Sequence, residues 1–418
     1  MRAIFMGLMA FLLLPLGGSS MAGAQSASSD ELYRSPLPLP PGAPGHVIHS
    51  ASLMNAAALP DAQQNLLVLY KSISIKGHDI AVSGTIAIPK GDAPAAGWPV
   101  TTWTHGTTGI GPPCAPSRDT SDGPEHLFLG IKQVLMNDYV RRGYVVVATD
   151  YEGLGTPGPH LFLQGVSEGR GALDIVRAAR TIDSRIGSRY VVVGHSQGGH
   201  ADLFAAAIGA SYAPELTLLG NVAIAPASHI GTTVAAMTVE AKPSYALGYA
   251  MYVLQSFSAN HPAIDLKKIL TQEALDHLPE TRKNCITNLV SEGYWATAIP
   301  KEQFIPSADL TAVQAGAAAN DPATLRVASP TLILQGMADV TVQPAWTDQV
   351  AHALCQNGTP LEYMIYPGAD HETVVTAATA DIAAWIDARF SDETPASNCA
   401  ALPTVAGGDG EKLEMRSR

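Results

Sequence analysis

Residues 190–200 read Tyr190-Val-Val-Val-Gly-His-Ser-Gln-Gly-Gly-His200, an apolar run that leads into a glycine-flanked serine. The apolar run at 190–193 predicts a buried strand, and 198–209 predicts a helix. Between them, residues 194–198 fit Gly-x-Ser-x-Gly, a tight strand-to-helix turn that presents its serine outward. The helix start also directs free N–H groups towards a developing oxyanion. We therefore predict that Ser196 is a nucleophile rather than part of an ordinary turn.

Strands and helices alternate along most of the chain around this turn. Apolar runs and helical spacing predict strands at 66–75, 80–88, 100–104, 144–149, 190–193, 218–224, 331–335 and 362–366, and helices at 134–142, 169–182, 198–209 and 373–390. This alternation implies right-handed crossovers and a mainly parallel sheet. The segment 228–325 lacks strand alternation and contains helix-like stretches. We therefore predict an α/β fold, a mainly parallel sheet flanked by helices, with a helical cap inserted at 228–325.

The first 24 residues have the pattern of a secretory signal peptide. Arg2 supplies the positive start, residues 4–16 are apolar, and Ala22-Gly-Ala24 is a small-residue cleavage site. The apolar run is shorter than the about 20 residues that a membrane span needs. We therefore predict cleavage near Ala24 rather than anchoring, and a secreted or periplasmic protein. No later stretch predicts a transmembrane segment.

The rest of the chain is expected to have five parts. Residues 25–60 begin with many Ser, Pro and Gly residues and predict an N-terminal arm. Residues 61–227 predict the first part of the core. The cap at 228–325 is followed by the second part of the core at 326–398 and by a C-terminal tail at 399–418. The sequence has no internal repeats.

Composition narrows the range of partners. Of the 418 residues, 46% are hydrophobic and 15% are charged, which is enough apolar material for a sizeable core. The formal net charge is −12, and no cluster of Lys and Arg stands out. A surface for nucleic acid is therefore not expected, and a neutral or weakly polar substrate fits better than a polyanion.

The chain contains four cysteines, Cys114, Cys285, Cys355 and Cys399. An even number of cysteines in an oxidising compartment predicts two disulfides. None of the four lies in a Cys-x-x-Cys pair, so a zinc site is not expected. Three pairings are possible, and their spacing does not choose among them.

A serine hydroxyl becomes a good nucleophile only when a base removes its proton. His371 follows the last predicted strand, which is where such a base is expected. The acid should lie between the two in the chain, and Asp339 follows the strand at 331–335. A hydrogen bond from His371 to Asp339 would fix the imidazole and stabilise its charged form. Asp370 is the alternative, but adjacent side chains rarely point at each other's ring nitrogens.

The tetrahedral oxyanion needs two backbone donors. One is expected from the N–H of Gln197, the residue after the nucleophile, and the other from Thr107 in His105-Gly-Thr107, which follows an early strand. The alternative for this second segment is a glycine-rich loop without a special role. His195 and His200 flank the serine and are expected to support packing.

No cofactor or metal is expected. Gly153-Leu-Gly-Thr-Pro-Gly158 matches the dinucleotide pattern Gly-x-Gly-x-x-Gly after a strand. However, Pro157 and Pro159 oppose the helix start that dinucleotide binding requires at this point.

Four segments together resemble the secretory lipase family, the group of Candida lipase A. They are Cys114-Ala-Pro-Ser117, Arg142-Gly-Tyr-Val-Val-Val-Ala-Thr-Asp-Tyr-Glu-Gly153, Gly194-His-Ser-Gln-Gly-Gly199 and Ser211-Tyr-Ala-Pro-Glu-Leu216. The resemblance extends from about residue 88 to residue 386. It implies an α/β-hydrolase core with a helical cap, and lipase or esterase activity.

The resemblance also carries specific roles onto this chain. It implies that Ser196 is the nucleophile, Asp339 the acid and His371 the base. It further implies disulfides between Cys114 and Cys285 and between Cys355 and Cys399.

These observations predict a secreted carboxylic ester hydrolase that forms an acyl-enzyme. Its substrate is expected to be a small-molecule or lipid ester, with the cap as the part that would contact a lipid interface. The alternatives are a serine peptidase or acyltransferase on the same fold, and a non-catalytic binding module.

Overall fold

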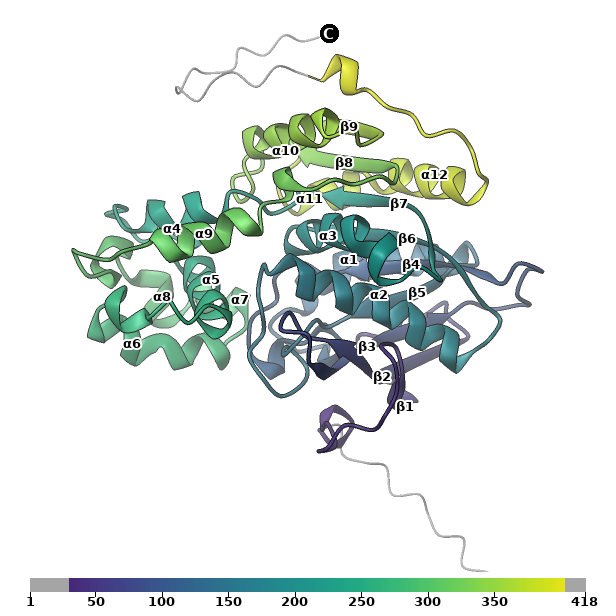
Figure 1. Ribbon diagram of the computed structural model, residues 1–418, viewed down its shortest axis with the longest axis horizontal. Helices are drawn as coiled ribbons and strands as arrows, with labels where there is room; N and C mark the ends of the chain where they lie inside the picture. The colour runs from purple at the N-terminus through teal and green to yellow at the C-terminus, as the bar shows by residue number, and fades with distance from the viewer. Residues whose placement is uncertain (1–29, 403–418) are drawn as a thin grey trace, which may run out of the picture.

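A nine-stranded sheet lies at the centre of the molecule. The computed structural model describes residues 30–402, and helices cover both sides of the sheet (Figure 1). The strands are β1 (Val47–Ser52), β2 (Gln64–Ile73), β3 (Asp79–Ile88), β4 (Trp98–Thr104), β5 (Val145–Thr149), β6 (Ile186–His195), β7 (Thr217–Ile224), β8 (Thr331–Gly336) and β9 (Leu361–Tyr366). Their spatial order is β1-β2-β3-β5-β4-β6-β7-β8-β9. Because β5 and β6 lie on opposite sides of β4, the strand order reverses there, and ligands bind at such reversals.

Most of the sheet is parallel. The pairings from β5 through β4, β6, β7 and β8 to β9 are parallel, and only those among β1, β2, β3 and β5 are antiparallel. The predicted α/β class, with a mainly parallel sheet flanked by helices, is confirmed.

Helices bury both faces of the sheet. On one face lie α1 (His126–Arg141), α11 (Thr373–Ala377) and α12 (Thr379–Phe390), and on the other lie α2 (Gly165–Ile182), α3 (Gln197–Tyr212) and α10 (Pro344–Gln356). Strand β6 shows how one apolar run packs against the helices on both faces of the sheet. Val191 and Val193 belong to the core cluster with α1 and α12, whereas Tyr190 and Val192 belong to the cluster with α2. A strand buried on both faces therefore has a continuous apolar sequence.

A group of helices is inserted between β7 and β8. It contains α4 (Ile230–Met237), α5 (Ala246–Asn260), α6 (Gln272–His277), α7 (Ile286–Ser291), α8 (Gly293–Thr297) and α9 (Thr311–Ala319), and we call it the helical insertion. Figure 1 shows it as a separate layer beside the sheet. It has its own apolar cluster, to which Phe162 and Leu163 of the core also contribute. Among residues 30–402, no helix is both long and apolar enough to cross a membrane.

Some details differ from the expectations. Strand β1 lies within the segment expected as an arm and pairs with β2 at the edge of the sheet. The sequence did not predict this strand, because its residues alternate only weakly between buried and exposed positions. Helix α10 was not predicted, and the helix expected at 373–390 is broken at Ala378. The signal peptide expected at 1–24, and residues 403–418 of the expected tail, lie outside the described residues.

Two disulfides join distant parts of the chain, with the pairing that the resemblance implies. Cys114 in the loop after β4 bonds to Cys285 in the helical insertion, and Cys355 of α10 bonds to Cys399. Next to the first disulfide, the Ile286 N–H donates to the Thr108 carbonyl at 2.9 Å. This disulfide therefore links the helical insertion to the loop that contains Thr107.

Removing the two disulfides separately should give different results. The double substitution Cys355→Ser/Cys399→Ser should lower the free energy of unfolding by about 2–4 kcal/mol, because the unfolded chain gains freedom. Hydrolysis of a p-nitrophenyl ester, the activity that the resemblance implies, should stay within about twofold of the original, because this disulfide joins α10 to the C-terminal segment. Denaturant unfolding and steady-state kinetics would measure both effects.

The double substitution Cys114→Ser/Cys285→Ser is the matched comparison. It should cost somewhat more stability, because this disulfide closes a longer stretch of chain, 171 positions against 44. It should also reduce ester turnover, because it releases the loop that contains Thr107. Equal turnover in the two variants would contradict the expectation that this disulfide holds the loop that contains Thr107 in its working position.

Candidate active site

The expected site residues follow four strands at the carboxyl edge of the sheet. Ser196 follows β6, Asp339 lies three residues after β8, His371 lies five residues after β9, and Thr107 lies three residues after β4. These strands run parallel to one another, so their carboxyl ends meet at the same edge. Side chains far apart in the sequence are thereby brought to one edge of the sheet.

Ser196 has an unusual backbone conformation. Its φ is 59° and its ψ is −118°, a region that residues other than glycine rarely adopt. Its N–H donates to the Ile224 carbonyl at 2.9 Å, and its carbonyl accepts hydrogen bonds from the N–H groups of His200 and Ala227. The turn is therefore held from β7 and from α3, and such retained strain is common at functional sites.

Two glycines allow the turn to close. A Cβ atom on Gly194 would lie 2.1 Å from the Gly198 carbonyl oxygen, and one on Gly198 would lie 1.9 Å from the Thr104 carbonyl oxygen. The Thr104 hydroxyl donates to the Gly198 carbonyl at 2.8 Å. The glycines in Gly-x-Ser-x-Gly are thus required because three backbone segments approach closely.

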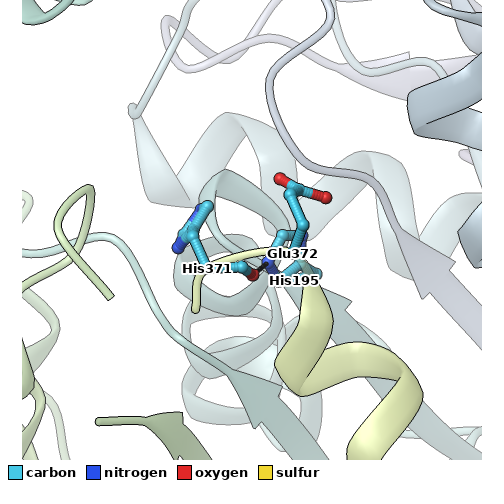
Figure 2. A group of neighbouring side chains, drawn as sticks. All are labelled: His195, His371 and Glu372. Carbon is cyan, nitrogen blue, oxygen red and sulfur yellow. Dashed lines mark hydrogen bonds between the residues drawn. The ribbon is translucent and has the colours of Figure 1, made fainter. Parts of the chain in front are cut away.

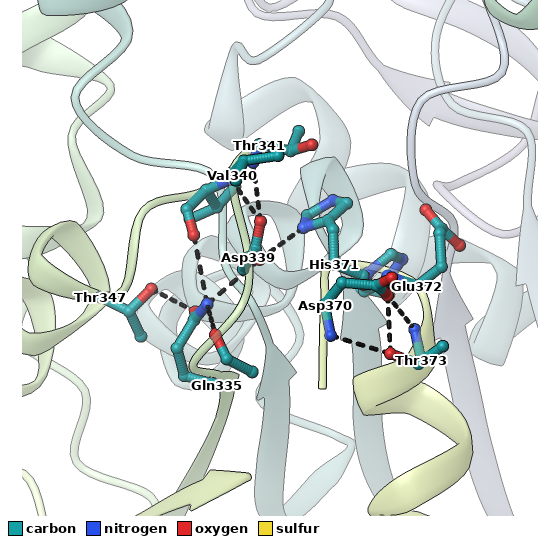
Figure 3. A network of polar contacts seen from close by, with 12 residues as sticks. Gln335, Asp339, Val340, Thr341, Thr347, Asp370, His371, Glu372 and Thr373 are labelled. Carbon is teal, nitrogen blue, oxygen red and sulfur yellow. Dashed lines mark hydrogen bonds and ion pairs between the residues drawn. The ribbon is translucent and has the colours of Figure 1, made fainter. Parts of the chain in front are cut away.

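His371 and Asp339 form a direct hydrogen bond. Nδ1 of His371 lies 2.7 Å from Oδ2 of Asp339, and both side chains are largely buried. The other carboxylate oxygen accepts the N–H groups of Thr341 and Val342, and Gln335 donates to Oδ2 (Figure 3). Because a carboxylate faces Nδ1, that nitrogen carries the hydrogen, and Nε2 is left free to accept a proton.

Asp370, the alternative acid, has other partners. Its Oδ1 accepts hydrogen bonds from the N–H of Glu372 and from both the N–H and the hydroxyl of Thr373 (Figure 3). These hydrogen bonds to Thr373 lower the pKa of Asp370. The carboxylate of Asp370 therefore caps the turn into α11, whereas Asp339 contacts the imidazole.

His195 links the serine turn to the loop of His371. Its side chain is fully buried, and its Nε2 donates to the main-chain carbonyl of His371 at 2.7 Å. The centroids of the two rings lie 4.6 Å apart. Burial, followed by the charge of His371, lowers the pKa of His195 well below its usual range, so His195 remains neutral. The residue before the serine thus does more than pack, because it holds the main chain of His371.

Three side chains of the kinds that can bind a metal ion lie close together here: His195, His371 and Glu372 (Figure 2). Each has a partner within the protein. Nε2 of His195 contacts the His371 carbonyl, Nδ1 of His371 contacts Asp339, and Glu372 forms an ion pair with Lys132. These contacts connect the loop after β9 to β6, β8 and α1.

A cavity of about 540 Å³ borders the serine. Thr107, Ser196 and Gln197 all line it, so the two expected oxyanion residues and the expected nucleophile reach one space. Most of the remaining lining is apolar and comes from the helical insertion and from the loop before α2, including Phe162 and Ile230. The volume lies within the range of small-molecule binding sites.

Several buried polar residues beside this cavity were not singled out from the sequence. Glu168 of α2 is fully buried and contacts the side chains of Gln197 and His200, and His160 contacts Gln197 as well. One available signal was the position of Glu168 among the small and apolar residues of its helix, since a fully buried carboxylate is rare unless it is paired.

Comparisons with known proteins agree on a family. The sequence model described as secretory lipase matches residues 124–398, more than half of the chain. Lipase A of Moesziomyces aphidis is 25% identical over 416 residues, covering 90% of this chain and 83% of that protein. Lipase 2 of Candida albicans is 25% identical over 412 residues, covering 93% and 86%.

A solved structure supports the fold. Candida antarctica lipase A in its closed state superimposes with a TM-score of 0.69 at 22% identity, covering 88% of this chain and 87% of that one. At this level of identity the likeness extends to the fold alone.

Substituting Gly198 should destabilise the protein. In Gly198→Ala, the new methyl group meets the Thr104 carbonyl, and overpacking of this kind costs about 1–3 kcal/mol. The melting temperature should fall, and labelling by a fluorophosphonate should slow because the serine turn is displaced.

Gly130→Ala is the matched control. Gly130 lies within α1, and a Cβ there would meet nothing within 4 Å. This substitution should stabilise the protein by about 0.5–1 kcal/mol. If both variants melted above the original protein, the close approach at Gly198 would be refuted.

Proposed function

The chain belongs to the secretory lipase family, whose reaction is the hydrolysis of carboxylic esters, and we propose that Ser196, His371 and Asp339 are its catalytic triad. The observation that carries this proposal is the 2.7 Å hydrogen bond between His371 and Asp339, at the sheet edge where the strained turn of Ser196 also lies. This arrangement contains a nucleophile, a base and a group that orients the base.

In the first half of the reaction, Ser196 Oγ attacks the ester carbonyl carbon while Nε2 of His371 takes the hydroxyl proton. The carbonyl oxygen becomes an oxyanion, and the backbone N–H groups of Gln197 and Thr107 stabilise it. Asp339 stabilises the imidazolium that forms. The intermediate then expels the alcohol, which receives the proton from His371, and an ester to Ser196 remains.

In the second half, water replaces the alcohol. His371 takes one proton from the water as its oxygen attacks the acyl carbon, and the same two N–H groups stabilise the second oxyanion. Breaking the bond to Ser196 releases the carboxylic acid, and His371 returns the proton to Oγ. Each step conserves atoms and charge with groups that the chain itself supplies.

The cavity beside Ser196 indicates the kind of ester. Its lining is mostly apolar, so it suits the hydrocarbon part of a lipid ester. Tyr245 of the helical insertion and Val340 line this cavity and are also exposed to solvent. We propose that this rim contacts lipid surfaces, and that the protein is secreted after cleavage near Ala24.

Replacing the nucleophile tests the proposal directly. Ser196→Ala should reduce kcat for a p-nitrophenyl ester on the order of 10⁵- to 10⁶-fold, because a triad acts as a unit. Labelling by a fluorophosphonate should disappear while the melting temperature stays within a few degrees. Amide and alcohol-acceptor substrates measured in parallel would distinguish a hydrolase of esters from a peptidase or an acyltransferase. Near-normal ester turnover by Ser196→Ala would end the assignment.

Two aspartates near His371 provide a matched pair. Asp339→Asn should reduce kcat about 10⁴-fold, because the amide would favour the wrong tautomer of His371. Asp370→Asn should reduce kcat less than tenfold, because that side chain contacts main-chain groups and Thr373. The opposite order of effects in steady-state kinetics would assign the acid to Asp370.

A further inference from the structure

The side chain of Gln197 is held by two acceptors from outside its helix. Its Nε2 lies 2.7 Å from Oε1 of Glu168 and 3.1 Å from Nε2 of His160. All three side chains are almost completely buried. The other ring nitrogen of His160, Nδ1, donates a hydrogen bond to the Glu152 carbonyl at 2.9 Å. In a neutral ring, Nε2 of His160 is therefore an acceptor. Burial lowers the pKa of His160 to about 4, which agrees with a neutral ring.

These contacts determine the orientation of the amide. Both hydrogens of the Gln197 amide are used, whereas its buried Oε1 has no partner among the described residues 30–402. The reverse orientation would place this oxygen against the carboxylate of Glu168. The side chain is therefore oriented by its two acceptors, even though a buried oxygen is left without a hydrogen bond.

Glu168 and His200 share an additional proton. Nε2 of His200 lies 2.8 Å from the carbonyl of Asn320, which can only accept, so this nitrogen carries a hydrogen. Nδ1 of His200 faces Oε2 of Glu168 at 3.2 Å. One more proton must lie between these two atoms, on either the ring or the carboxyl group. The pair as a whole is therefore neutral, which removes the cost of an isolated buried charge.

The position of this pair matters because of what Gln197 does in the reaction. On the proposed function, the backbone N–H of Gln197 stabilises the oxyanion. We propose that Glu168, neutralised by His200, is a positioning residue that anchors the Gln197 side chain and thereby aims this backbone N–H at the oxyanion. An uncompensated carboxylate at this place would oppose the negative charge that develops in the transition state, so a neutral pair suits the reaction.

Three substitutions in the full-length protein test this inference. Gln197→Met removes both donor hydrogens but keeps the backbone N–H and a similar size. Glu168→Met removes the acceptor of the Gln197 amide and also that of the Leu163 N–H, which donates to the same oxygen at 3.0 Å. Glu168→Gln is the conservative control, because its oxygen can still accept from Gln197 and its amide can donate to a neutral His200. For each variant, kcat, KM, the melting temperature and the inhibition constant of an alkylboronic acid are measured, since the boronate adduct mimics the tetrahedral intermediate.

The expected result is a selective loss of transition-state stabilisation. Gln197→Met and Glu168→Met should reduce kcat about 10- to 100-fold, with KM within about threefold, and weaken the boronic acid by a similar factor. Glu168→Gln should keep kcat within about threefold. If Glu168→Met does not fold, Gln197→Met decides alone, because it leaves the buried pair in place.

Two results would overturn the inference. One is a Gln197→Met variant with unchanged kcat and boronate inhibition. The other is a variant whose melting temperature falls while boronate inhibition stays unchanged, which would mean a role in stability only. Ser196→Ala separates this inference from the proposed function: if it abolishes turnover while Gln197→Met has no effect, the triad stands and the positioning role fails. If Ser196→Ala remains active, the proposed function itself fails.

Discussion

The 2.9 Å hydrogen bond from the Ser196 N–H to the Ile224 carbonyl is the contact on which the rest of the site depends. It extends the pairing of β6 and β7 by one residue and holds Ser196 in a conformation that an isolated chain would avoid. The helix α3 then starts at Gln197, the closing glycines fit against β4, and the residues after β8 and β9 approach from the other side. An ordinary hydroxyl is thus placed at a helix start, where the backbone favours negative charge.

The sequence correctly predicted the strand before Ser196, the aspartate that contacts His371 and, through the family resemblance, the cysteine pairing. The apolar run before Ser196 could be assigned to a strand because a strand buried on both faces has no alternation. The chain order of a serine, an aspartate and a histidine left Asp339 and Asp370 as candidates for the acid. Asp339 was preferred because adjacent side chains rarely point at each other's ring nitrogens, and the hydrogen bond of His371 goes to Asp339. The family resemblance selected one of three cysteine pairings, which spacing alone left open, and the structure has that pairing.

Other features could not be read from the sequence because they depend on contacts between distant segments. Edge strand β1 is defined by pairing with β2 rather than by its own pattern. Glu168 belongs to α2 and His200 to α3, and only the packing of these helices brings both to Gln197. His195 was expected to support packing, but its hydrogen bond to His371 becomes visible only when the loop after β9 is in place.

The segment from Cys285 to Thr287 contacts the loop after β4 three times, through the disulfide, the bond from Ile286 to Thr108, and the bonds from Thr287 to Glu125. The helical insertion and this loop are therefore one unit, although 171 positions separate the two cysteines. Chimaeras that exchange the insertion between relatives, to alter which esters are accepted, would need to exchange this loop as well. A boundary drawn only at β7 and β8 would cut through the unit that it was meant to transfer.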